Sequence, residues 1–186
     1  MAEPALKRMT FDEFHRWSAD RPDEFVYELV DGVPRAMVRP VLVHQLIVMN
    51  TCVAFDDALG DGPCGAFPRA LVEVGPDTYR VPDVAVLCDA DDLTQRYGTE
   101  PVVLVEVLSP STMDVDLYAK HEEYRGIAGL RHFAFVSADR AHVALWTRSD
   151  DEWSVEEFEG LDASVPFGGL GVELSLGRLY RRTGLD

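Results

Sequence analysis

The sequence lacks any apolar run of the roughly 18 residues that a membrane-spanning helix needs. Its first residues also lack the apolar centre of a signal peptide. Cysteine is scarce. Cys52, Cys64 and Cys88 are too few and too scattered for a disulfide framework or a structural zinc site. We therefore expect no membrane association and a reducing, cytoplasmic location.

Positive charge is also scarce. Seventeen Lys and Arg residues stand against 33 Asp and Glu residues, which gives a formal net charge of −16. Such a chain is repelled by phosphate backbones in general, so any binding of nucleic acid must depend on a local site. The 186 residues, 47% of them hydrophobic and 27% charged, predict one domain over residues 1–186 with a hydrophobic core.

The order of helix and strand patterns indicates the fold class. A capping box at Thr10–Glu13 predicts a short first helix, and Asp31-Gly32 between two apolar runs predicts a hairpin. We expect further helices over 41–59 and 114–127, strands over 67–74, 80–88, 101–109 and 152–160, a hairpin over 131–148 and a short final element. This order predicts an α/β domain with a central mixed β-sheet flanked by helices.

A carboxylate interrupts the aliphatic run PVVLVEVL at residues 101–108. Glu106 shares one strand face with Leu104 and Leu108, and the other face carries valines. Apolar residues on both faces are typical of a strand covered on both sides, where an unpaired carboxylate is costly. Glu106 should therefore have a partner, be protonated, or bind a cation.

Two more carboxylates follow the same pattern. Glu28 lies in FVYELV and Asp83 in RVPDVAVL, each between aliphatic neighbours. Any one of them could be a strand-end residue exposed to water. Three clustered carboxylates would repel one another and raise their pKa values, whereas Mg²⁺ would remove the repulsion because it prefers oxygen ligands.

The helix expected after Glu106 carries a candidate cation. Leu117, Lys120, Tyr124 and Ile127 follow a helical spacing and share one face, which should point inward, while neighbouring charged residues should point elsewhere. A lysine on that face could serve a phosphate site. It could equally pair with Asp116, four residues earlier, or extend its amine to the surface.

Several motifs together resemble a known family. Asp83 after Pro82, followed by Glu106 in an aliphatic strand, resembles the PD-(D/E)XK nuclease superfamily. The segments YELVDG (27–32), RVPDVAVLCD (80–89), VEVLSPST (105–112) and EEYRGIAGLRHFAFV (122–136) are similar to the Uma family of proposed restriction endonucleases. The resemblance covers roughly residues 10–150.

The resemblance implies a restriction-endonuclease-like core and Mg²⁺-dependent hydrolysis of DNA phosphodiester bonds, with Mn²⁺ as an alternative metal. Carried over by position, Asp83 and Glu106 would be metal ligands, and the backbone carbonyl of Val107 would add a third oxygen. Glu28 matches the acidic residue that often completes such a site. The metal would polarise the scissile phosphate and lower the pKa of a bound water.

One position departs from the superfamily motif. Leu108 stands where the motif has a lysine, two residues after Glu106. Lys120 is our candidate for the migrated lysine, which would orient the water or offset developing charge. His44, at the start of the long helix, could face the same cleft or act only as a cap or surface residue.

Two other functions remain open. The chain could be an inactive nuclease-fold module that binds nucleic acid or protein or acts as a dimerising accessory protein, or a metal-dependent phosphoesterase for small nucleotides. A positive patch at the cleft mouth would favour DNA over both, and its candidates are Arg35, Arg39, Arg69 and Arg80. Strand-rich hairpins near the end predict a homodimer, because an exposed sheet edge invites pairing.

Overall fold

The computed structural model describes residues 8–21, 25–88, 94, 97–98, 100–108, 116–150 and 152–185. The helices are α1 (Phe11–Ala19), α2 (Leu42–Leu59), α3 (Asp116–Arg125) and α4 (Leu176–Leu179). The strands are β1 (Tyr27–Val30), β2 (Val33–Ala36), β3 (Cys64–Pro68), β4 (Val72–Gly75), β5 (Thr78–Arg80), β6 (Val84–Cys88), β7 (Pro101–Leu108), β8 (His132–Ser137), β9 (His142–Ser149), β10 (Glu152–Glu159), β11 (Ser164–Phe167) and β12 (Val172–Ser175).

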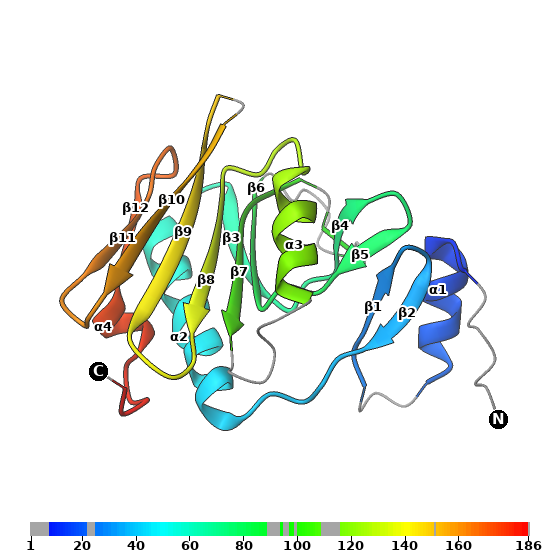
Figure 1. Ribbon diagram of the computed structural model, residues 1–186, viewed down its shortest axis with the longest axis horizontal. Coiled ribbons are helices and arrows are strands. Elements are labelled where there is room, and N and C mark those ends of the chain that lie inside the picture. Colours follow the sequence, from blue (N-terminus) through cyan, green and yellow to red (C-terminus); the bar gives the residue numbers. More distant parts are fainter. Residues whose placement is uncertain are drawn as a thin grey trace.

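A six-stranded sheet forms the centre of the fold, in the order β10-β9-β8-β7-β6-β3. Strands β7 and β8 run parallel, and the other neighbouring pairs run antiparallel. Helices α2 and α3 cover opposite faces of this sheet (Figure 1). The predicted α/β class, with a central mixed sheet flanked by helices, is confirmed.

Side-chain alternation along β7 fills both sides of the sheet. Val103 and Val105 pack in the core cluster that includes Phe55 of α2, whereas Leu104 packs with Tyr124 of α3. All of these side chains are buried. Glu106 shares the parity of Leu104 and therefore faces α3, which determines the partners available to its carboxylate.

A smaller sheet lies beside the first, with the strand order β2-β1-β5-β4. Helix α1 packs on it, and the predicted capping box at Thr10 and Glu13 is present. Asp31 and Gly32 form the predicted hairpin turn with φ values of 50° and 74°, which Gly and Asp tolerate better than most residues.

Two strand predictions were wrong in their extent. Residues 80–88 do not form one strand: β5 ends at Arg80 in the small sheet, and β6 begins at Val84 in the large one. Pro82, which lacks an N–H group, lies where the chain crosses between the sheets. Residues 67–74 are likewise divided, because Arg69 adopts a φ of 54° between β3 and β4.

The C-terminal part adds more structure than the single element expected. The β11–β12 hairpin and α4 pack against α2 in the same core cluster. Tyr180 is buried there, and its hydroxyl oxygen lies 2.8 Å from each of the carbonyl oxygens of Ser137 and His142, either of which can accept its proton.

Two cysteines form a disulfide that the sequence did not indicate. Strands β3 and β6 pair so that Cys64 lies opposite Cys88, and the two sulfurs are bonded. Within the residues that the structure describes, no helix is long and apolar enough to cross a membrane.

Candidate active site

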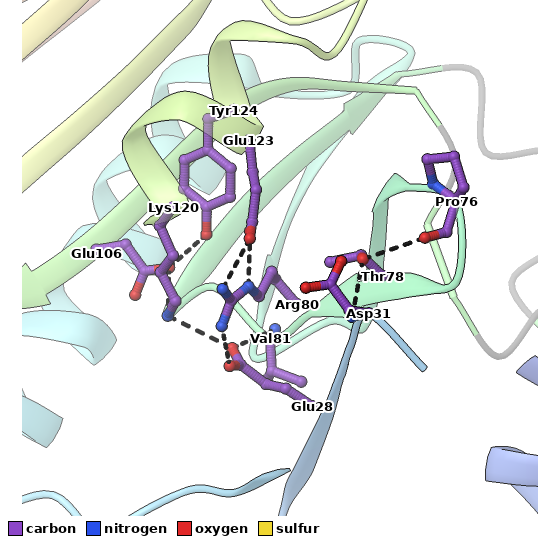
Figure 2. Close-up of polar contacts among 10 residues, drawn as sticks. All are labelled: Glu28, Asp31, Pro76, Thr78, Arg80, Val81, Glu106, Lys120, Glu123 and Tyr124. Carbon is purple, nitrogen blue, oxygen red and sulfur yellow. Dashed lines mark hydrogen bonds and ion pairs between the residues drawn. The ribbon is translucent and has the colours of Figure 1, made fainter. Parts of the chain in front are cut away.

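Four candidate residues gather where the two sheets meet. Glu28 lies on β1, Asp83 in the crossing between β5 and β6, Glu106 on β7 and Lys120 on α3. Their exposed fractions are only 4%, 8%, 6% and 6%, respectively. Figure 2 shows Glu28, Glu106 and Lys120 pointing toward one another from three elements.

Lys120 joins two of the carboxylates. Its Nζ lies 3.0 Å from Oε1 of Glu106 and 3.4 Å from Oε1 of Glu28 (Figure 2). The inward orientation predicted for Lys120 from the helical spacing is confirmed, whereas its role in catalysis stays a prediction. An ammonium group here offsets the repulsion between two buried carboxylates.

Glu106 has a second partner on the same helix. The Tyr124 hydroxyl donates to its Oε1 at 2.5 Å, a short hydrogen bond. Burial raises the pKa of Glu106 to about 7; the Lys120 ammonium opposes this rise, and the charge of Asp83 adds to it. Burial and the neighbouring Glu106 likewise raise the pKa of Tyr124 well above its ordinary value.

Asp83 is held by the strand that carries Glu106. Its Oδ2 accepts a hydrogen bond from the backbone N–H of Val107 at 2.8 Å, and Nε2 of His44 lies 3.1 Å from the same oxygen. The other ring nitrogen of His44, Nδ1, is buried without a hydrogen-bond partner among the described residues. A ring with a proton on Nε2 can donate to this oxygen and orient the carboxylate. His44 therefore faces the candidate site and is not only a helix cap or a surface residue.

Each of these two carboxylates keeps one oxygen open. Oδ1 of Asp83 and Oε2 of Glu106 accept no hydrogen bond from the described residues, and neither is among the fully buried unpartnered atoms. No group of three or more His, Cys, Asp and Glu side chains among the described residues is arranged to hold a metal. Two carboxylates can still suffice for Mg²⁺, which commonly takes one or two of them together with waters and other oxygens.

Arg80 does not belong to the positive patch that the sequence suggested. Its side chain is fully buried, donating to Oε2 of Glu28 at 2.8 Å and to both carboxylate oxygens of Glu123 at 2.7 and 2.9 Å (Figure 2). The expectation that Glu123 points away from the site was also wrong. The backbone N–H of Val81 donates to Glu28 as well, so these contacts fix the position of Glu28.

Two of the other patch candidates lie beside Asp83. Arg39 and Arg69 line a groove of about 680 Å³ that also contains Asp83 and His44. The backbone N–H of Arg69 donates to the carbonyl oxygen of Asp83 at 3.1 Å, which brings this arginine next to the candidate site. Arg35 is exposed on β2 and does not line the groove.

The raised pKa of Glu106 predicts a pH-dependent loss of stability. Because its pKa is about 7 when folded and 4.5 ordinarily, the folded state binds the extra proton between these values. This contribution to stability is complete below about pH 4.5 and is lost as the pH rises through about 7. In urea unfolding with EDTA, Glu106→Gln should therefore gain stability relative to the wild type between about pH 5 and pH 8.

The matched control is Glu156→Gln, which changes an exposed carboxylate on β10. Its difference from the wild type should be the same at both pH values. Parallel pH curves for Glu106→Gln and the wild type would show that Glu106 is ionised throughout.

Comparisons with known proteins agree with this fold. The chain is 26% identical over 178 residues to an uncharacterised protein of Synechocystis, covering 94% of this chain and 92% of that protein. It is similar to the crystal structure of a "putative nuclease" of the DUF820 group from Anabaena variabilis, with a TM-score of 0.72, 20% identity, and coverage of 92% of this chain and 97% of that one. Residues 11–177 match the family described as "Putative restriction endonuclease". The chain therefore belongs to the Uma2 family.

Proposed function

We propose that this protein is a metal-dependent endonuclease that hydrolyses DNA phosphodiester bonds, with Mg²⁺ as the natural metal and Mn²⁺ as a substitute. The observation that carries the proposal is the pair of open carboxylate oxygens, on Asp83 and Glu106, beside the buried amine of Lys120. Membership of a family described as "Putative restriction endonuclease" supports the same reaction.

Each residue of the candidate site would have a separate role in the proposed hydrolysis. Asp83 and Glu106 would hold the metal together with the carbonyl oxygen of Val107. When bound there, the metal would supply polarisation of the phosphate and a lower pKa for a bound water. Lys120 orients the attacking water and offsets the negative charge that develops on the phosphate. Glu28 keeps Lys120 in place through its 3.4 Å contact.

The direct test is nicking of supercoiled plasmid by the wild type with Mg²⁺, with Mn²⁺ and with EDTA. We expect nicking with either metal, none with EDTA, and recovery when excess Mg²⁺ is added back, because the carboxylates alone cannot activate water. The activity should coelute with the protein on two unlike columns, which excludes a contaminating nuclease.

The rival functions give different results in the same experiment. A folded protein that cleaves no DNA form with either metal would be a binding or accessory module. Hydrolysis of bis-p-nitrophenyl phosphate without nicking would indicate a phosphoesterase for small nucleotides.

A further inference from the structure

The groove beside Asp83 has unusually apolar walls for a site that should face DNA. Val26, Met37, Val38, Met49, Val53 and Pro68 line it. Three of these side chains are strongly exposed: Val38 to 84%, Met49 to 55% and Val53 to 51%. Exposed apolar side chains gathered in one hollow mark a surface that binds something.

The polar groups of the groove indicate the kind of ligand. Arg39 and Arg69 lie on the same surface as Asp83, in a protein with a net charge of −16. Arg69 holds a left-handed backbone conformation with a φ of 54°, a strained geometry that often marks functional positions. Two arginines beside a proposed catalytic carboxylate suit the phosphates of a strand that passes the site.

Paired DNA would make poor use of this surface. A duplex stacks its bases inside and presents mainly phosphate and sugar, and its affinity for proteins comes largely from many Lys and Arg contacts. The faces of bases that have left the stack are the large flat apolar surfaces of DNA that such a wall can cover. Methionine also suits such contacts, because its flexible thioether adapts to aromatic rings.

We infer that the groove binds the unpaired bases of a single DNA strand, with Arg39 and Arg69 on its phosphates, so that the substrate of the proposed nuclease is single-stranded or locally unpaired DNA. This inference rests on the proposed function for the role of Asp83. The groove's volume of about 680 Å³ suits a ligand of one or two nucleotides. Its lining residues include Met37, Val38 and Arg39, which lie between β2 and α2, and Val48, Met49 and Val53 of α2.

The test measures binding without catalysis. Fluorescence anisotropy in EDTA compares a labelled oligonucleotide with the duplex that it forms with its complement, at one salt concentration. We expect the single strand to bind at least about tenfold more tightly than the duplex. The double variant Val38→Gln/Met49→Gln should weaken single-strand binding by about tenfold, because it removes apolar surface without changing charge.

The matched control is Val155→Gln/Leu161→Gln. Val155 is 54% exposed and Leu161 is 40% exposed, and neither lines the groove. This control should bind the single strand as the wild type does. Equal or tighter binding of the duplex, or unchanged single-strand binding by the groove variant, would overturn the inference, as would the absence of any binding by the wild type.

The experiment also separates this inference from the proposed function. Plasmid nicking without preferential binding of the single strand would contradict the inference about the groove and support the proposed nuclease activity. Single-strand binding that is lost in the groove variant, without cleavage under any metal, would support binding by the groove and contradict the proposed nuclease activity. If the groove variant turns a dimer into a monomer and keeps its single-strand affinity, the groove is an interface between copies and the inference fails.

Discussion

Replacing Asp83 with asparagine is expected to lower the rate of metal-dependent DNA cleavage by at least about 100-fold. The change removes one negative charge from the proposed metal site, and an amide NH₂ group can take the place of the open oxygen Oδ1. The remaining oxygen can still accept the N–H of Val107, which Oδ2 accepts now at 2.8 Å. The fold should therefore survive, and single-turnover nicking at saturating Mg²⁺ measures the loss.

The control is Asp162→Asn, which makes the same change at an exposed turn between β10 and β11. It should nick plasmid at the wild-type rate. Both variants should unfold within about 0.5 kcal/mol of the wild type if Asp83 acts mainly in catalysis. Cleavage by Asp83→Asn at the wild-type rate would remove Asp83 from the mechanism.

Local pattern was enough to predict part of the site. Glu106 and Lys120 each lie in one regular element, so the alternation of β7 and the helical spacing of α3 determine where they point. The same spacing placed Tyr124 on the inward face of α3, one turn after Lys120. Its hydrogen bond to Glu106 could have been proposed from that spacing, and only its length needed the structure.

The pairing of strands that are far apart in the sequence cannot be predicted from the pattern of residues within each strand. Cys64 and Cys88 are separated by 24 residues and meet because β3 pairs with β6 in one register. Asp83 looked like a strand residue because Val81, Ala85 and their neighbours continue the apolar run. The crossing between the two sheets interrupts that run and brings Asp83 to β7, and nothing in the local sequence except Pro82 marks the break.

Arg80 was misplaced for a related reason. Arginine is rarely buried without partners, so the sequence favoured an exposed position in a basic patch. Its partners Glu28 and Glu123 are 52 and 43 residues away, on β1 and α3, and the paired strands and helix that bring them together appear only in the structure. The Arg80 guanidinium thus joins β5 to β1 and α3, three elements that the sequence pattern describes separately (Figure 2).

Replacing Arg80 with methionine is therefore expected to destabilise the protein by about 3–5 kcal/mol. Methionine has a similar length, so the loss comes from the charge and its hydrogen bonds: Glu28, only 4% exposed, would keep its carboxylate without the guanidinium that now lies at 2.8 Å. Urea unfolding at neutral pH measures the change in the free energy of unfolding.

Arg35→Met provides the contrast that isolates burial from charge. Arg35 is exposed on β2, directly opposite Glu28 in the strand register, so its loss removes the same charge near the same carboxylate. Because water screens the charge of the exposed Arg35 side chain, this variant should lie within about 0.5 kcal/mol of the wild type. Arg80→Lys should fall between the two, since lysine keeps the charge and loses the two-pronged contact with Glu123. Equal stability of the Arg80→Met and Arg35→Met variants would contradict this prediction and would mean that Arg80 contributes packing alone.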